Sequence, residues 1–499
     1  MHVLHHTCVR LIRRAILSLF RDDRGNVLIL SAAFMIPMLA LVGSSIDVGR
    51  AYVARSRMQQ ACDAASLAGR WAFSQGQTTT SATNEALKFF NFNFKQGAFG
   101  TESFTPAVNV TGSTTKVVQV TAATTLRLSV MGIFGFQPIR VAASCTAEQN
   151  FVNTDIVLVL DTTGSMAQTM PGDTQTKISA LRSAVLALYD QLAPIQTQLA
   201  AAGMRLRFSV VPYSSTINVG KLIYNVKPEY IRNPAPYYQA NTCYSGRSSY
   251  TCYQQVSVNH STSGPNWFTN SWGGCIEERQ TTSAITSTST TIPSAAYDLD
   301  IDKIPTPDVN TQWPPYDTSA ETAKSFVACP SEAKRLQTWT RADLSTYLNG
   351  LSPNGGTYHD IGMIWGARMI SNAGIFADSP DTYAGMPTNK FVIFMTDDML
   401  DTNLDSYSAY GVERYDQRVT GGDLTSQDAR HQQRFNLMCK AIKNRSVSIW
   451  VVVFNSSMSS DIVNCASNAG QASKATNAAD FINKFTEIGK NIGAMRLTQ

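Results

Sequence analysis

The longest apolar stretch of the chain lies near its N-terminus. Residues 27–46, VLILSAAFMIPMLALVGSSI, form a run of 20 residues without a charge. As a helix this run would extend about 30 Å, which matches the hydrocarbon thickness of a bilayer. A signal peptide would have a shorter apolar core, followed by a small-residue cleavage site. Because the run continues into helix-compatible residues, we predict an uncleaved transmembrane helix rather than a signal peptide.

The pattern changes twice after this span. Residues 47–75 are rich in Ala and poor in β-branched side chains, which favours a helix. Residues 76–104 are polar and rich in turn residues. Apolar and polar positions then alternate between residues 107 and 146, which is typical of half-buried strands. We predict a small β-rich domain next to the membrane.

Strand and helix patterns alternate from Asp155 onward. The run IVLVLD at 156–161 is continuously apolar, as in a strand buried on both faces. Further strands are predicted at residues 205–213, 390–397 and 447–454, and helices at residues 177–199, 339–349, 358–372, 426–444 and 478–492. This alternation implies an α/β fold with a doubly wound, mostly parallel, Rossmann-like sheet and helices on both faces.

Residues 216–341 interrupt the alternation with a long insert that contains four cysteines and many aromatic residues. Since a structureless loop of roughly 125 residues is unusual in a compact domain, we predict a disulfide-stapled subdomain or lid. The aromatic side chains would form its core or, alternatively, a surface that binds glycan or protein by stacking.

These patterns divide the chain into six predicted segments. They are a cytoplasmic N-terminus (1–24), a transmembrane anchor (25–47), a helix with a β-rich stalk (48–150), the first half of the α/β domain (151–215), the insert (216–341) and the second half of the α/β domain (342–499).

Composition and charge narrow the function classes. The 41 Lys and Arg residues exceed the 36 Asp and Glu residues by only five, and they form no basic stripe, so nucleic acid is not an expected partner. An apolar fraction of 43% is enough to form a core and argues against a disordered chain. Five arginines precede the span: Arg10, Arg13, Arg14, Arg21 and Arg24. By the positive-inside rule they place the N-terminus in the cytoplasm, so the chain after the span is expected to be exported.

The nine cysteines include no CxxC pair that would suggest a metal site. In an oxidising compartment, disulfides are expected among those of the insert and between the two that flank a later strand. The candidates are Cys243, Cys252, Cys275 and Cys329 in the insert, and Cys439 and Cys465 further on. Their connectivity is open, and unpaired buried thiols are the alternative.

Polar side chains gather where predicted strands end. Asp161, Thr163 and Ser165 follow the first buried strand, Asp397 ends a later one, and Thr357 lies on a loop before a helix. In α/β sheets, ligands bind at the carboxyl ends of the strands. Two carboxylates and three hydroxyls suit a hard octahedral cation, whereas the absence of His and thiolate argues against zinc. We therefore predict a divalent ion, with Mg²⁺ favoured and Mn²⁺ or Ca²⁺ as alternatives.

The same five residues resemble the metal-ion-dependent adhesion site of von Willebrand factor A domains. Asp161, Thr163 and Ser165 match its DxSxS motif with Thr in place of the first Ser, while Thr357 and Asp397 match its threonine and second aspartate. The resemblance implies that the three hydroxyls contact the ion directly and the two aspartates directly or through water. The alternative is a degenerate A domain without metal.

The N-terminal segment resembles TadE/TadG-type proteins of bacterial tight-adherence (Flp) pilus systems. The resemblance rests on Arg24-Gly25-Asn26 before the span, and on Asp47-Val48-Gly49-Arg50 and Asp63-Ala64-Ala65 after it. The stretch at residues 362–371, GMIWGARMIS, also resembles the A domain of TadG-like members. No Glu follows Gly25 as in the prepilins of this system, which favours a permanent anchor.

Together the resemblances imply a single-pass protein of the bacterial inner membrane, with its bulk periplasmic or surface-exposed. They imply metal-dependent protein binding in adhesion or assembly of the pilus, with a partner from the pilus system or envelope that offers an acidic residue to the metal. The alternative role is an envelope assembly factor or chaperone that uses the A domain for a contact within a complex, without adhesion.

Catalysis is not expected. His359 and Asp360 lie beside Thr357, but adjacent positions on a helix point in different directions. The other histidines suggest no Ser-His-Asp arrangement, and Gly355-Gly356 lacks the lysine of a phosphate-binding loop.

Overall fold

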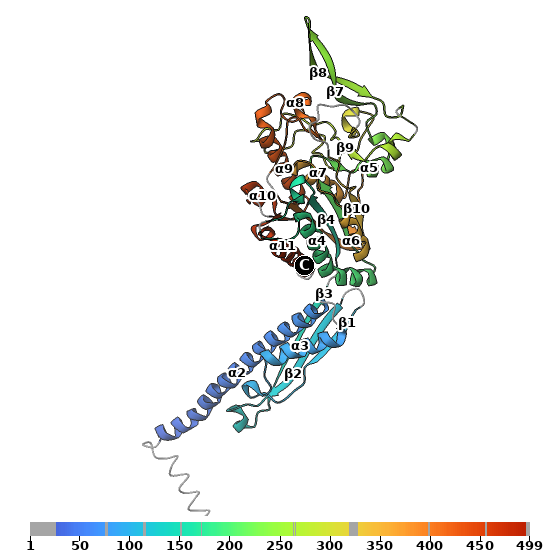
Figure 1. The fold of residues 1–499 in the computed structure, drawn as a ribbon. Helices are drawn as coiled ribbons and strands as arrows, with labels where there is room; N and C mark the ends of the chain where they lie inside the picture. The colour runs from blue at the N-terminus through green and yellow to red at the C-terminus, as the bar shows by residue number, and fades with distance from the viewer. Residues whose placement is uncertain are drawn as a thin grey trace, which may run out of the picture. The chain divides into compact units, whose positions relative to one another are not determined.

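The structure is a computed structural model that describes residues 26–74, 78–112, 116–149, 152–170, 172–262, 264, 266–318, 328–397, 400–454 and 457–495. The predicted cytoplasmic segment 1–24 and its arginines lie outside the described residues. The chain forms two compact units, Met1–Gln149 and Asn150–Gln499 (Figure 1).

A single long helix, α2 (Asn26–Ser74), runs through the described part of the first unit. Its Leu30–Phe73 portion has a mean hydropathy of 1.6 in its most apolar window, and it is long and apolar enough to cross a membrane. Most of the described side chains between residues 30 and 46 are exposed, whereas the second half of the helix buries a stripe of small residues, among them Ala54, Ala61 and Ala65. These small side chains let neighbouring elements approach the helix closely.

Although residues 76–104 are polar and rich in turn residues, they contain helix α3 (Thr79–Asn93). The side chain of Thr78 caps it by accepting a hydrogen bond from the backbone N–H of Ser81. Ala82, Ala86 and Phe90 recur at every fourth position and are buried. This narrow apolar stripe, set among polar residues, stabilises the helix through tertiary contacts rather than through composition.

The first unit is completed by an antiparallel sheet in the order β1 (Ala107–Thr111), β2 (Lys116–Leu126) and β3 (Ile139–Gln149). Alternate residues of β2 are buried, and Val118 and Val120 share one core with Ala61 of α2. A disulfide between Cys62 and Cys145 joins α2 to β3. These two cysteines were not among the predicted pairs.

The second unit is built on a mostly parallel sheet, which confirms the predicted fold class. Strand β4 (Asn153–Asp161) lies at its centre, parallel to β5 (Leu206–Tyr213) on one side and to β12 (Met386–Thr396) on the other. Strands β15 (Ser448–Phe454) and β16 (Ala472–Ala475) extend the sheet beyond β12 in parallel, while β10 (Lys334–Gln337) pairs antiparallel with β5. This order, reversing direction at β4, is that of a doubly wound sheet.

Helices cover both faces of this sheet. Ile156, Leu158 and Leu160 of β4 share a core with α4 (Lys177–Ala201), α6 (Arg341–Asn349) and α11 (Ala478–Met495). Val157 and Val159 instead share a core with α7 (His359–Ile370) and α9 (Gln427–Lys443). The continuous apolar run of β4 is therefore explained by burial on both faces.

The insert contains a hairpin of β7 (Ala235–Ser245) and β8 (Ser248–Val258), which is closed by the disulfide Cys243–Cys252 (Figure 1). Two further short strands, β6 (Ile217–Asn218) and β9 (Cys275–Ile276), and strand β10 fall within residues 216–341, yet belong to the main sheet. The disulfide Cys275–Cys329 lies within the insert, while Cys439–Cys465 joins α9 to α10 (Ser460–Cys465).

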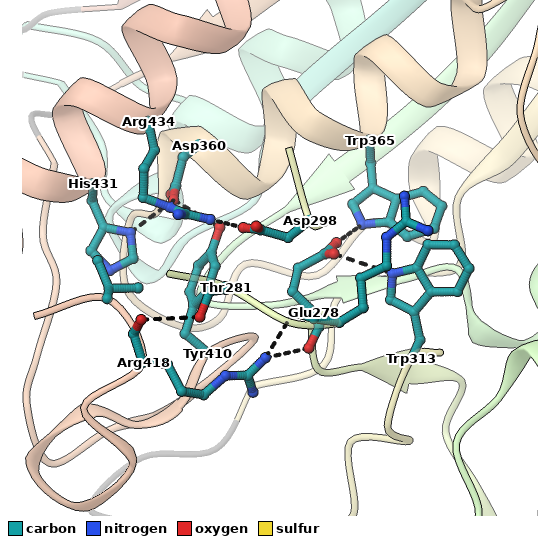
Figure 2. Close-up of polar contacts among 12 residues, drawn as sticks. Glu278, Thr281, Asp298, Trp313, Asp360, Trp365, Tyr410, Arg418, His431 and Arg434 are labelled. Carbon is teal, nitrogen blue, oxygen red and sulfur yellow. Dashed lines mark hydrogen bonds and ion pairs between the residues drawn. The ribbon is translucent and has the colours of Figure 1, made fainter. Parts of the chain in front are cut away.

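Buried polar contacts fasten the insert to the helices of the α/β domain (Figure 2). Glu278 accepts hydrogen bonds from Trp365 Nε1 at 2.6 Å and Trp313 Nε1 at 3.1 Å, and pairs with Arg368 Nη1 at 2.7 Å. Asp298 pairs with Arg434 of α9. Since Trp313 also lies in the same apolar core as Val157 and Trp365, the insert shares the core of the domain.

Candidate metal centre

Asp161 ends the central strand and is fully buried. One oxygen, Oδ1, accepts a hydrogen bond from the backbone N–H of Thr163 at 2.9 Å. The other, Oδ2, accepts from Thr396 Oγ1 at 2.8 Å and from the Tyr213 hydroxyl at 3.4 Å. The parallel register places Tyr213 of β5 opposite Asp161, and Thr396 ends β12 on the other side. Its two neighbouring strands therefore fix the orientation of this carboxylate.

The turn after β4 directs two hydroxyls toward the end of β12. The oxygens Thr163 Oγ1 and Ser165 Oγ lie 2.9 Å apart. Ser165 Oγ donates to Asp397 Oδ1 at 2.8 Å, although 232 positions separate the two residues. Thus Asp161, Thr163, Ser165 and Asp397, four of the five predicted residues, are connected by hydrogen bonds at the carboxyl end of the sheet.

Thr357, the fifth predicted residue, lies on a loop that is fastened to the same turn by backbone contacts. The N–H of Gly164 donates to the carbonyl of Gly355 at 2.9 Å, and the N–H of Asn354 donates to the carbonyl of Thr162 at 2.8 Å. Gly355 has φ +94°, and a Cβ there would lie 2.7 Å from Ala328 Cβ, so this close approach requires glycine. Among the hydrogen bonds of the described residues, none links the Thr357 hydroxyl to the other four.

Sequence reasoning missed Lys177. Its Nζ lies 2.8 Å from Asp397 Oδ2, and the two side chains are only 9% and 0% exposed. Lys177 is the first residue of α4, where a positive charge is disfavoured by the helix dipole. The sequence gives no direct signal for this contact, because its acidic partner lies 220 positions away.

The electrostatics of the site favour an added cation. Burial, and secondarily the negative charge of Asp397, raises the pKa of Asp161 to about 7. A positive ion near both carboxylates would relieve this repulsion, as Lys177 does for one oxygen of Asp397. The oxygen-only donor set of two carboxylates and nearby hydroxyls fits a hard divalent cation. No cluster of three or more His, Cys, Asp or Glu side chains suited to a metal ion occurs within the described ranges.

His359 and Asp360 point to different surroundings, as their adjacent positions on the helix predicted. His359 Nε2 lies 3.0 Å from Thr396 Oγ1, so it supports the hydroxyl that holds Asp161. Asp360 instead accepts hydrogen bonds from the Tyr410 hydroxyl at 2.7 Å, from His431 Nδ1 at 2.8 Å and from Arg434 Nε at 3.2 Å (Figure 2). This second group is buried and serves the contact between α7 and α9.

The sheet order and the three loops at its carboxyl edge define a doubly wound α/β domain with polar side chains gathered where its strands end. Residues 25–75 match the family model described as "Putative Flp pilus-assembly TadE/G-like". The chain thus carries a TadE/G-like segment at its N-terminus. A search of curated proteins found no match.

Solved structures with partial similarity include the pilus adhesin SpaC from Lactobacillus rhamnosus GG, at 11% identity and a TM-score of 0.32, covering 79% of this chain and 36% of that one. The vWF domain of the type V pili tip protein Mfa5 from Porphyromonas gingivalis gives 9% identity and a TM-score of 0.31, covering 70% of this chain and 97% of that one.

Proximal thread matrix protein 1 from the mussel byssus, in a form with a zinc-occupied MIDAS motif, gives 9% identity and a TM-score of 0.28, covering 69% of this chain and 46% of that one. Of the SpaC structure, the chain spans about a third of the length.

Proposed function

We propose that this protein is a membrane-anchored, metal-dependent protein-binding component of a tight-adherence pilus system. The observation that carries the proposal is the convergence of Asp161, Thr163, Ser165 and Asp397 at the carboxyl edge of the sheet. With Thr357 on the adjoining loop, these residues would hold a divalent ion, with Mg²⁺ favoured over Mn²⁺ and Ca²⁺. A carboxylate of a protein partner could then coordinate the bound ion.

The residues of the site have separate tasks in this proposal. Thr163 and Ser165 present neutral hydroxyl ligands, so the ion keeps part of its charge for the partner. Tyr213 and Thr396 hold the Asp161 carboxylate in place, and the Gly355 carbonyl keeps the Thr357 loop next to the turn. Because Asp161 already accepts several hydrogen bonds, contact with the ion through water is the simpler arrangement for it.

The membrane and pilus parts of the proposal rest on the N-terminal segment. Residues 25–75 match the TadE/G-like pilus-assembly family, and α2 is long and apolar enough to cross a membrane. We propose a single-pass arrangement in the bacterial inner membrane, with the N-terminus in the cytoplasm and the bulk of the chain in the periplasm or at the surface. No catalytic role is proposed.

A role in envelope assembly is the second candidate function, because the description of the matched family names pilus assembly. Deletion of the protein distinguishes the two roles. Loss of pilus fibres indicates assembly, whereas intact fibres with weak attachment indicate adhesion.

Metal binding is tested by calorimetric titration of the full-length protein in detergent with Mg²⁺ and Mn²⁺. We expect saturable binding by the native chain and its loss in Asp161→Ala and Asp397→Asn. The control is Asp190→Asn, which changes an exposed carboxylate in an Arg341 ion pair. Unaltered affinity in both site variants would refute the metal site.

Partner binding is tested by recovering envelope proteins on the native chain, on Asp161→Ala and on the native chain with a chelator. A partner that is lost in both altered conditions supports binding through the ion. A partner retained in both means that the contact lies elsewhere, in the insert or in the first unit.

A further inference from the structure

The turn between β2 and β3 has an unusual surface. Arg127 and Arg140 bracket the uncharged sequence LSVMGIFGFQPI, whereas hairpin turns in water are mostly polar. Three large apolar side chains are exposed within it: Ile133 by 83%, Phe136 by 60% and Phe134 by 44%. Neighbouring exposed apolar side chains of this size indicate a surface that contacts something other than water. We call residues 128–139 the hairpin tip.

The hairpin tip is fastened to one level of α2. The Asp47 carboxylate accepts hydrogen bonds from three successive backbone N–H groups of the tip, those of Ser129 at 2.8 Å, Val130 at 3.0 Å and Met131 at 2.9 Å. Arg50 adds hydrogen bonds to the Ser129 hydroxyl and to the carbonyl of Phe99. These contacts give Asp47 and Arg50 a structural role, because they fix the turn against the helix.

The attachment extends one helical turn further toward the N-terminus. Gly43 faces Val130 so closely that a Cβ at Gly43 would collide with its side chain. Gly43 belongs to the uncharged run 27–46, which ends where Asp47 begins. The hairpin tip therefore lies at the level where the apolar span of α2 ends.

The exposed apolar surface continues from the helix to the tip. On α2, the side chains of Ile36 and Leu39 lie seven and four residues before Gly43, hence on the same face of the helix, and are 61% and 53% exposed. Beyond Gly43 on this face lies the hairpin tip, with exposed Ile133 and Phe136. Asp47 does not interrupt it, because its carboxylate is buried beneath the three N–H groups of the tip.

We propose that the hairpin tip is a second membrane contact, which inserts Ile133, Phe134 and Phe136 into the interface of the bilayer that α2 crosses. This inference rests on the proposed membrane anchoring of α2. Apolar and aromatic side chains favour the interface of a bilayer, and the flanking Arg127 and Arg140 suit its headgroups. A lone helix is free to tilt and rotate, and a second contact at one level of the helix fixes how the first unit leaves the membrane.

The proposal is tested with nitroxide spin labels on the full-length protein, reconstituted in vesicles of phosphatidylcholine and phosphatidylglycerol. The label is attached at Ile133→Cys in a Cys8→Ser background, so that the cysteines of the four disulfides stay paired. Phe92→Cys on α3 is the matched control, since Phe92 is 82% exposed. Met38→Cys reports the span itself. Collision with oxygen, which partitions into lipid, is compared with collision with a water-soluble nickel chelate.

We expect the labels at Ile133→Cys and Met38→Cys to collide preferentially with oxygen, and the label at Phe92→Cys with nickel. If Met38→Cys behaves as lipid-embedded but Ile133→Cys resembles Phe92→Cys, the tip proposal is wrong and the anchor stands. If Met38→Cys is also open to nickel, the anchor fails, and the tip proposal with it. Protection of Ile133→Cys from both reagents would mean that a protein covers the tip, which also overturns the proposal.

Discussion

Replacing Lys177 by Met tests whether this lysine and a metal ion share the same carboxylate. In the structure the ammonium group lies 2.8 Å from Asp397 Oδ2, and both side chains are almost completely buried. The substitution removes the positive charge and keeps most of the side-chain volume. Asp397 then retains the hydrogen bond from Ser165 but loses its counter-charge.

The magnitude follows from the burial of the pair. Breaking a buried ion pair by removing one partner costs about 3–5 kcal/mol, whereas an exposed pair contributes about 1 kcal/mol or less. We expect the free energy of unfolding of the metal-free variant to fall by about 3 kcal/mol at pH 8. At this pH both carboxylates are ionised, so no bound proton reduces their repulsion. For a unit of this size that loss lowers the melting temperature by about 4 °C.

Thermal unfolding with and without Mg²⁺ is the assay. We expect Mg²⁺ to raise the melting temperature of Lys177→Met more than that of the native chain, because the ion replaces the missing charge. Lys177→Arg retains the charge and should resemble the native chain. Arg341→Met breaks an ion pair whose side chains are 58% and 42% exposed, and should have little effect. If Mg²⁺ raises the melting temperatures of Lys177→Met and the native chain by the same amount, the lysine and the ion do not share Asp397. If the metal-free melting temperature of Lys177→Met equals that of the native chain, the Lys177–Asp397 ion pair does not stabilise the fold.

Three further predictions concern stability. Burial, partly offset by Arg418, raises the pKa of Glu277 from 4.5 to about 7. The folded state therefore holds the proton of Glu277 more tightly than the unfolded state does. This protonation contributes fully to the stability of the fold below about pH 4.5, and the contribution is lost as the pH rises through 7. Glu277→Gln should therefore flatten the fall in melting temperature between pH 5 and 8, and an unchanged slope would contradict this. Gly362→Ala places a Cβ 2.7 Å from a Tyr213 ring carbon and should cost about 1–3 kcal/mol in chemical denaturation, so native-like stability would disprove the tight contact of α7 with the sheet. Replacing Cys62 and Cys145 by Ala opens a loop of sequence separation 83 and should lower the unfolding free energy of the first unit by about 4 kcal/mol, measured by hydrogen exchange; unaltered protection of α2 and β3 would argue against it.

The strands and helices with strong periodic patterns could be predicted from the sequence. The run at 156–161 lies in β4, and the helices predicted at 177–199 and 426–444 correspond to α4 and α9 within a few residues. In these segments the spacing of the apolar residues itself shows which side chains are buried, so the local sequence is enough to predict the helix or strand. Strand β16 has no such pattern, because ASKA acquires its strand conformation from pairing with β15.

The candidate site was predictable in part for the same reason. Asp161 and Asp397 each end an apolar run, so their meeting follows from the parallel sheet. Lys177 and Tyr213 could not be assigned in advance, because their contacts with the two aspartates depend on the start of a helix and on strand register. The pairing of the cysteines likewise depends on tertiary structure, and the polar surroundings of Ala82, Ala86 and Phe90 hid helix α3.

The central position of β4 also has a mechanical consequence. Only residues 150–152 separate the last residue of β3 from the first residue of β4 in the sequence. A pull transmitted along the backbone from the first unit therefore enters the α/β domain at the strand that is paired on both sides, with eight residues in register with β12 and eight with β5. A load directed along the strand would shear both ladders at once, so their hydrogen bonds would resist together rather than opening one after another. The path of the chain thus delivers tension to the central strand of the sheet, the one whose far end carries Asp161.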